Sequence, residues 1–441
     1  MVSGVVASPK APAETAPGYV TGVLLAGWIL ALLDRMLINI LVPGIKASLH
    51  VSDTQVSLLQ GFAFAIFFSV AGIPIGRLVD RANRRNLLIV GVLGWSLATM
   101  ACGLASSFPA LFAGRVMMGV FQAVLAPASL SMVADYCAAD RRGRTTAVLV
   151  SGGTIGSAGS AILGGMVLQM FSGLAPLPSP FGGTLAAWQS TLIVAGLPGL
   201  LLAALLLLVR EPERQNLAAA GDFRALTYIS ANRKVFVPLY AAFGLFLFAG
   251  YALAMWAPVI LMRNLAMPPR EAGLIVGGIN LVAAGVAAFG GGFLSDYFER
   301  RDPGAGRLKL ALLLALVSAV AILPLLVLQR PSILLSMFLF SALLTAFSST
   351  AYTLLPELAP SEARGQVIAV FVLIGNIFGI GFAPTAIALV TDHVLHDEAR
   401  VNVSMVLVAA PSLLLIALLI SIALPHARRL RRAILAESAG T

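Results

Sequence analysis

Charged residues are scarce in this chain. Only 11% of its 441 residues are charged, 59% are hydrophobic, and the mean hydropathy is +0.95. Soluble domains carry about 25% charged residues, so the composition excludes an ordinary water-soluble protein. The apolar residues also form long runs, which is not the alternation over about ten residues that a membrane β-barrel requires.

Cysteine and histidine are almost missing. The chain has two cysteines, Cys102 and Cys137, and four histidines, His50, His393, His396 and His426. So few ligands exclude a disulfide framework and a multi-cysteine metal site, and we expect neither a metal nor a cofactor. The sequence also lacks H-E-x-x-H, G-x-S-x-G and any pair of carboxylates within an apolar run, which argues against a membrane enzyme acting on lipid.

Basic residues outnumber acidic ones, and the net charge is +10. Such an excess raises the possibility of a nucleic-acid partner. However, the arginines and lysines lie in short clusters between apolar runs, which is typical of the cytoplasmic loops of a membrane protein. We therefore expect the lipid bilayer, and no nucleic acid, as the partner of these charges.

The apolar runs predict twelve membrane-spanning helices, because backbone groups must find hydrogen-bond partners within the lipid. The runs cover residues 19–42, 56–79, 87–106, 109–135, 146–170, 187–209, 235–261, 272–295, 308–329, 332–355, 366–391 and 402–424. The predicted fold class is an all-α membrane protein with two pseudo-symmetric six-helix bundles.

The basic residues also predict the orientation. One side of the predicted membrane receives 22 lysines and arginines and the other side five, while Arg35 and Arg115 fall inside spans. The positive-inside rule then places both termini in the cytoplasm of a multi-pass inner-membrane protein. We expect a disordered tail without signal-peptide features over 1–18, bundles over 19–209 and 235–424, a linker over 210–234, and a basic tail over 425–441.

An internal repeat supports the division into two halves. At an offset of 216 residues, Gly61, Gly76 and Asp80 match Gly277, Gly292 and Asp296. At an offset of 222 residues, the segment that begins Arg142-Gly143 matches the one that begins Arg364-Gly365. Glycine recurs by chance in apolar helices, but the matched charged residues make chance a poor explanation.

The loop between the second and third runs reads Gly76-Arg-Leu-Val-Asp80-Arg81-Ala-Asn83-Arg84-Arg85. It resembles the signature loop of the major facilitator superfamily, with Asn83 in place of the second glycine. We expect Asn83 to tolerate the left-handed backbone conformation there. The resemblance implies a latch between the halves, with Gly76, Asp80, Arg81, Arg84, Arg85, Arg142, Asp296 and Arg364 as gating residues. The arginines could instead serve topology alone.

Four further sequence segments indicate which family of this superfamily the chain resembles. They are Asp34-Arg35, Arg115-Val-Met-Met-Gly119, Tyr251-Ala-Leu-Ala-Met-Trp256-Ala-Pro258 and Gly291-Gly292-Phe-Leu-Ser-Asp296. Together they resemble the Spinster family of lipid transporters, although the anion:cation symporter family shares the first pair and the arginine of the second string. The resemblance implies alternating-access transport of a lysophospholipid-like or sphingosine-phosphate-like amphipath, coupled to protons.

Only Asp34, Arg35 and Arg115 are ionisable residues deep within runs. Such residues cost about 2.5–3.5 kcal/mol on insertion scales, so they indicate a functional site. Guanidinium groups match anionic headgroups, and we expect Arg35 and Arg115 to bind the substrate. Asp34 is the candidate proton carrier, and members of the Spinster family often carry a glutamate at the position of Gln122. The alternative is a permanent Asp34–Arg115 ion pair that only joins two helices.

The second half has no deep charge. Its polar residues inside runs include Tyr251, Asn280, Asn376, Thr345 and Ser348. A cavity that is charged on one side and apolar on the other suits an amphipath. We therefore expect four side chains of this half to contact the substrate: Tyr251, Trp256, Asn280 and Asn376.

The expected substrate-binding side chains outside the arginines are Gln122, Tyr251, Trp256, Asn280 and Asn376. The predicted function is a monomeric secondary transporter of an amphipathic anionic small molecule, driven by protons. The alternative is a proton-coupled symporter of a small organic anion, which would need more polar partners in the second half.

Overall fold

The computed structural model describes residues 17–180, 182–214, 225–360 and 363–439. Within these residues, twelve helices are long and apolar enough to cross a membrane, which confirms the predicted all-α membrane fold. The helices are hydrophobic on the outside as well as within the bundle. Phe293, Leu201 and Val70, for example, are 73%, 65% and 64% exposed, as expected for side chains that face lipid tails.

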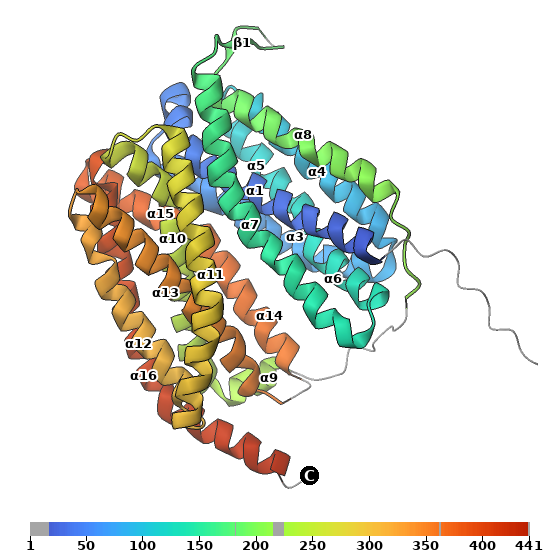
Figure 1. The fold of residues 1–441 in the computed structure, drawn as a ribbon, viewed down its shortest axis with the longest axis vertical. Helices are drawn as coiled ribbons and strands as arrows, with labels where there is room; N and C mark the ends of the chain where they lie inside the picture. Colours follow the sequence, from blue (N-terminus) through green and yellow to red (C-terminus); the bar gives the residue numbers. More distant parts are fainter. Residues whose placement is uncertain (1–16, 181, 215–224, 361–362, 440–441) are drawn as a thin grey trace, which may run out of the picture.

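The N-terminal half holds the first six spans (Figure 1). Its elements are α1 (Pro17–Leu49), α2 (Asp53–Ser57), the π-helical segment η1 (Leu58–Phe62), α3 (Ala63–Arg81), α4 (Arg84–Gly103), α5 (Phe108–Gln122), α6 (Leu125–Tyr136), α7 (Ala139–Ser172) and α8 (Ala187–Leu207). Between α7 and α8, β1 (Leu177–Pro178) pairs antiparallel with β2 (Thr184–Leu185). We call the end of the molecule that carries this pair the hairpin end.

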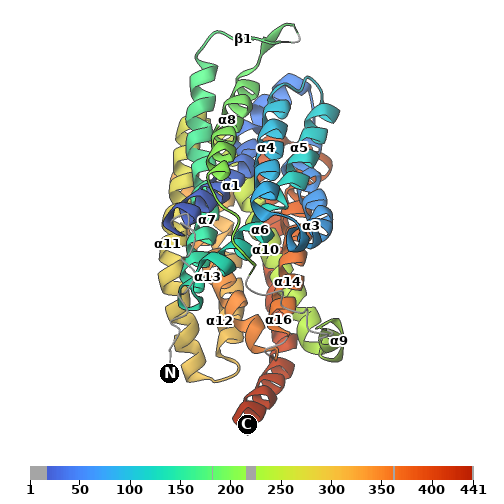
Figure 2. The same cartoon turned by 90° about the vertical axis from the view of Figure 1, so that its right-hand side faces the viewer.

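The C-terminal half holds the other six spans. Its elements are α9 (Ala225–Ala231), α10 (Arg233–Asn264), α11 (Pro269–Arg301), α12 (Gly306–Ala321), η2 (Leu323–Leu326), α13 (Arg330–Glu357), α14 (Arg364–Ile374), η3 (Gly375–Phe382), α15 (Ala383–Leu389), η4 (Val390–Leu395), η5 (Glu398–Arg400) and α16 (Val401–Ala439). Figure 2 shows the end of α16 opposite the hairpin, and we call that end the terminal end.

The segments expected outside the bundles are described in part. Residues 1–16 and 215–224 lie outside the described residues. The short helix α9 lies within the expected linker, and α16 continues as a helix through most of the expected basic tail. The final span and that tail are therefore one helix.

The turn between α3 and α4 differs from the sequence expectation. Asn83 has φ −70° and ψ 113°, so its backbone is extended and not left-handed. Its side chain accepts a hydrogen bond from the backbone N–H of Asn86 at 2.9 Å. Asn83 is thus the N-cap of α4, and an N-cap residue requires the extended conformation.

The two halves meet where glycine removes a side chain. A Cβ atom on Gly61 would lie 2.2 Å from the carbonyl oxygen of Ile380 in η3. A Cβ on Gly277 in α11 would lie 2.7 Å from the carbonyl oxygen of Ala158 in α7. These two glycines are partners in the internal repeat, so the pseudo-symmetry of the sequence reappears as two equivalent helix crossings between the halves.

Figure 1 shows that α7 and α11 run side by side toward the hairpin end, whereas α6 and α14 diverge at the terminal end. Charged groups join the halves at the hairpin end. Asp53, which is fully buried, accepts from Lys46 at 2.6 Å and from Arg263 of the other half at 2.7 Å. Lys46 also pairs with Glu398 of the other half at 2.7 Å.

A neighbouring contact adds to this closure. The backbone N–H and the hydroxyl of Thr54 both donate to Asp392 of the other half, each at 2.7 Å. We define Lys46, Asp53, Thr54, Arg263, Asp392 and Glu398 as the hairpin-end lock. The structure is therefore closed at the hairpin end and open at the terminal end.

From the hairpin-end lock we predict that Asp53→Asn opens the hairpin end. Removing the carboxylate leaves Lys46 and Arg263 without their shared partner, a change that costs roughly 2–5 kcal/mol in comparable buried pairs. We expect spin-label distances between the hairpin ends of α7 and α11 to shift to longer values. Glu271→Gln is the matched control, since Glu271 pairs at the same end with Arg330 of its own half. Equal distance distributions in both variants would contradict a role for Asp53 in closure.

Candidate functional site

Arg35 on α1 is a cation without an anion. Its Nη2 donates to Gln122 Oε1 at 3.2 Å, and its guanidinium lies over the rings of Phe64 and Phe68, 4.3 and 5.0 Å from their centroids. Its Nε is buried and has no hydrogen-bond partner among the described residues. No carboxylate of the described chain lies within 4.0 Å of it. The aromatic faces offset part of the cost of this charge, which has no counter-ion among the described residues.

Arg115 on α5 is held differently. It is 3% exposed, and its Nε and Nη2 donate to the backbone carbonyls of Leu59 at 2.9 Å and of Arg35 at 3.2 Å. Its Nη1 lies 3.1 Å from the sulfur of Met118. Leu59 belongs to the π-helical segment η1, where the regular helical hydrogen-bond pattern is interrupted. In this conformation Arg115 therefore ties α5 to η1 and α1.

Gln122 is also fully engaged within the N-terminal half. Its Nε2 donates to the carbonyl oxygen of Ala31 at 3.2 Å, while its Oε1 accepts from Arg35. The side chain is 1% exposed. Gln122 thus orients the Arg35 guanidinium and connects it to the backbone of α1.

Asp34 lies on a different face of α1 from Arg35. It is 2% exposed and borders a small cavity of about 10 Å³, which Thr99, Cys102 and Arg115 also line. Its Oδ1 has no hydrogen-bond partner among the described residues, and no ion pair within 4.0 Å joins it to Arg115. The two groups interact electrostatically over a longer distance. The expected alternative of a closed Asp34–Arg115 pair is therefore not formed in this conformation.

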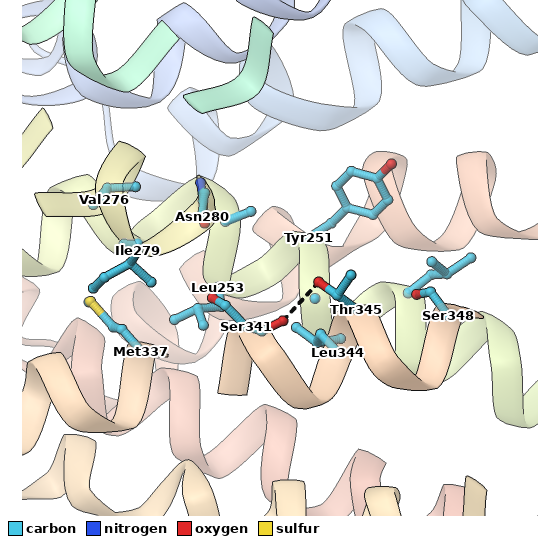
Figure 3. Close-up of a pocket in the computed structure, with 14 residues that line it drawn as sticks. Tyr251, Leu253, Val276, Ile279, Asn280, Met337, Ser341, Leu344, Thr345 and Ser348 are labelled. Atoms are coloured by element: carbon cyan, nitrogen blue, oxygen red, sulfur yellow. Dashed lines mark hydrogen bonds between the residues drawn. The ribbon is translucent and has the colours of Figure 1, made fainter. Parts of the chain in front are cut away.

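The cavity of the C-terminal half lies between α10, α11 and α13 and has a volume of about 270 Å³. Figure 3 shows Tyr251 and Asn280 pointing from this wall toward the helices of the N-terminal half. Arg35 of that half is close enough to Tyr251 for an electrostatic interaction. Most of the remaining lining is aliphatic, as at Leu253, Ile279 and Leu344. Of the predicted residues, Tyr251 and Asn280 line this cavity, whereas Arg35 is not among its lining residues and is linked to it through its interaction with Tyr251.

Two of the four predicted substrate-binding residues of the C-terminal half lie outside this cavity. Trp256 is fully buried within the C-terminal half, where its Nε1 donates to the carbonyl oxygen of Pro384 at 3.1 Å. Asn376 is half-buried in η3, and it is not among the residues that line the cavity. In this conformation Trp256 packs α10 against α15.

Three hydroxyl groups of α13 complete the polar part of the cavity. Ser341, Thr345 and Ser348 line it together, and the Thr345 hydroxyl donates to the backbone carbonyl of Ser341 at 3.0 Å (Figure 3). Their spacing of four and then three residues places them on one helical face. That spacing was a usable sequence signal for Ser341, which the sequence analysis did not select. The residues of the hairpin-end lock were missed as well, because their partners lie on distant segments.

The terminal end carries two related charge networks. In the N-terminal half, Arg84 pairs with Asp135 and, at 2.7 Å, with Glu211. In the C-terminal half, Arg307 pairs with Glu357 and, at 3.3 Å, with Asp296. Asp135 and Glu357 are 222 residues apart, the offset of the second repeat. Each network binds helices of its own half together.

Other predicted gating residues also bind within their own half. Arg142 donates to the carbonyl oxygen of Cys137 at 3.0 Å, and Arg364 donates to that of Ala359 at 3.4 Å, in equivalent positions of the repeat. The backbone N–H of Arg85 donates to Glu211 at 2.8 Å. These contacts brace the helix ends and leave the halves unlinked there.

The signature loop is also engaged within the N-terminal half. The guanidinium of Arg214 contacts the carbonyl oxygen of Asp80 and donates to those of Val79 and Ala82, both at 2.7 Å. The Asp80 and Arg81 side chains are exposed, whereas Gly76 is half-buried. Within the described parts of the chain, no ion pair or hydrogen bond joins Asp80 to the other half. This is the arrangement that an open latch would have.

The sequence of the described helices matches the family model of the Major Facilitator Superfamily over residues 24–384. An MFS-type efflux pump of Mycolicibacterium smegmatis is 28% identical over 403 residues, which cover 89% of each chain. Protein spinster homolog 1 of Xenopus tropicalis is 26% identical over 84% of this chain and 72% of its own length.

Solved structures agree with the fold. A bacterial homolog of the human lysosomal transporter Spinster, in an inward-facing and unoccupied conformation, superposes with a TM-score of 0.78. It is 23% identical, and the match covers 96% of this chain and 99% of that one. The relatives and the fold are those of transporters and not of enzymes. The chain therefore belongs to the major facilitator superfamily, as a Spinster-like transporter.

Proposed function

We propose that this transporter moves an amphipathic anionic lipid, of the lysophospholipid or sphingosine-phosphate type, and that protons drive it. The observation that carries the proposal is the Arg35 guanidinium, which has no carboxylate partner among the described residues and whose buried Nε lacks a hydrogen-bond partner there. A substrate phosphate or carboxylate would supply the missing negative charge. The planar fork of arginine suits such groups through paired hydrogen bonds.

The opposite wall supports an apolar tail on that anion. The cavity of about 270 Å³ is mainly aliphatic, and its polar atoms come from Tyr251, Asn280 and the hydroxyls of α13. A headgroup at Arg35 would place an acyl chain against Leu253, Ile279 and Leu344. A small polar anion would leave this apolar surface in water, which is why the amphipath is favoured.

Proton coupling is proposed for Asp34. It is the one carboxylate in the middle of a described span, and its burial without a close cation makes an ionised form costly. Arg115 connects it to the anion site, because Arg115 interacts electrostatically with Asp34 and also donates to the Arg35 carbonyl. A substrate anion that draws the guanidinium groups toward the cavity would change the charge around Asp34. Gln122 cannot carry a proton, so coupling depends on Asp34.

The working cycle is alternating access between two closures. The hairpin-end lock closes one side here, and the signature loop would close the terminal end in the opposite state. We further propose that the terminal end faces the cytoplasm of an inner membrane, because the basic clusters of the sequence lie there. On this proposal the protein works as a monomer in the bilayer, with the lipid and protons as its partners.

The anion site predicts that Arg35→Ala weakens binding of lysophosphatidylglycerol about 10- to 100-fold, the range expected for one charge-assisted interaction of about 1.5–3 kcal/mol. Arg35→Lys should restore only part of this affinity, because it loses the fork. Binding would be measured on purified protein, with Arg400→Gln, an exposed arginine at the hairpin end, as the control. Unchanged binding in Arg35→Ala would contradict the site. Competition by a small organic anion but not by the lysolipid would favour the small-anion symporter.

The coupling hypothesis predicts that Asp34→Asn retains substrate exchange in proteoliposomes and loses its response to an imposed pH gradient. The amide fills the same space but cannot bind and release a proton at neutral pH. Thr99→Val changes a neighbour in the same small cavity without removing a titratable group, so it should keep the gradient response. Full gradient-driven transport by Asp34→Asn would exclude Asp34 as the proton carrier.

The latch hypothesis predicts that Asp80→Asn depletes the state in which the terminal end is closed. The carboxylate would stabilise that state by accepting hydrogen bonds at a helix N-terminus of the other half, worth up to about 2 kcal/mol. Spin-label distances between the terminal ends of α3 and α14 should then lengthen on average. Asp140→Asn, an exposed carboxylate at the same end, serves as the control. Identical distances in the two variants would leave Asp80 without a gating role.

A further inference from the structure

A second cavity lies at the terminal end, outside the proposed transport route. It has a volume of about 560 Å³ and lies between the beginning of α10 and the last turns of α16. Its polar lining comes from Asn232, Arg233, Lys234, His426 and Arg429. We call it the basic groove. It belongs entirely to the C-terminal half, so its role is independent of the central site.

The cations of the basic groove have no internal partner. Among the described residues no ion pair involves Arg233, Lys234 or Arg429, whereas Arg428 pairs with Asp302 at 3.0 Å and Arg431 with Glu299 at 2.7 Å. These two paired arginines flank Arg429 on the same helix. The network around Asp302 is strong enough that the Lys309 hydrogen bond and the nearby arginines lower the pKa of its carboxyl group. One face of α16 therefore neutralises internal acids, while the face toward the groove keeps its charge.

The beginning of α10 adds a further positive potential. Asn232 is its N-cap residue, but the Asn232 side chain accepts no capping hydrogen bond and instead donates to the carbonyl oxygen of Tyr228 at 3.1 Å. The N-terminus of a 32-residue helix, with its partial positive charge, is thus left without a side-chain acceptor. Backbone N–H groups in such a position bind phosphate groups well.

The position of the groove points to the membrane as the source of the anion. Both α10 and α16 are long and apolar enough to cross a membrane, and the groove residues lie at the charged ends of their apolar stretches. One to two turns deeper on the same helix faces, Val237 and Ile422 are 60% and 51% exposed. A headgroup in the groove would therefore have lipid-facing surface directly below it for its acyl chains.

We propose that the basic groove binds the phosphate headgroup of an anionic phospholipid from the leaflet at the terminal end. Arg233, Lys234 and Arg429 supply the charge, the N-terminus of α10 supplies N–H donors, and Val237 and Ile422 border the chains. Basic pockets between membrane helices are known to select anionic headgroups in this way.

The test uses the full-length protein in detergent and native mass spectrometry. The probes are phosphatidylglycerol, phosphatidylcholine with the same acyl chains, and glycerol 3-phosphate. We expect phosphatidylglycerol to bind at least tenfold more tightly than phosphatidylcholine, and glycerol 3-phosphate not to compete at matched concentration. Equal binding of the two lipids would overturn the proposal. Competition by glycerol 3-phosphate would overturn the lipid assignment in favour of a soluble anion.

Variants identify the groove as the place of binding. Arg233→Gln and Arg429→Gln should each weaken phosphatidylglycerol binding about fivefold, the effect of one basic residue near a lipid surface. Arg432→Gln removes the same charge from α16 outside the groove and should leave binding unchanged. Arg429→Lys should retain most of the affinity, which separates loss of charge from loss of structure. Equal effects of Arg432→Gln and Arg429→Gln would contradict the assignment.

Discussion

The two halves pack closely where glycine leaves room for the backbone of the facing helix. The relative position of the halves depends on this constraint. Gly61 meets η3 and Gly277 meets α7 at distances that a Cβ atom would not allow. Because the two positions are equivalent in the repeat, the halves touch along two similar crossings.

The two halves also differ in the charged residues that they place in the membrane interior. The N-terminal half holds Asp34, Arg35 and Arg115, and it satisfies Arg115 with backbone carbonyls and supports Arg35 with aromatic rings. The C-terminal half offers an aliphatic wall with a few hydroxyl and amide groups. The proposed substrate, with one anionic end and one apolar end, would contact both walls, whereas neither wall by itself would distinguish such a molecule.

The charged residues at the helix ends form ion pairs, either within one half or between the two halves. At the terminal end, Arg84 and Arg307 bind acidic residues of their own half, so each half moves as a unit. At the hairpin end, Asp53 is shared by cations of both halves. The energetic difference between inward and outward states therefore depends on which of the two ends contains bonds between halves.

The sequence by itself determined the twelve spans and the two halves, and it singled out Arg35 as a candidate site residue. Each of these follows from a local property: the length of an apolar run, a repeated string, or a charge far from either end of a span. The pairing of Arg142 and Arg364 in the repeat likewise reappears as two equivalent backbone contacts.

Helix rotation and crossing were decided only by the tertiary structure. Asp34 and Arg35 are neighbours in sequence, yet an α-helix turns about 100° per residue, so Asp34 borders a small cavity while Arg35 contacts Gln122. Trp256 and Arg115 likewise point into their own halves because of their positions around the helix axis. Asp53 and Arg263 are 210 residues apart, and no local pattern pairs them. Their contact exists because glycine at the crossings lets the two halves approach at the hairpin end.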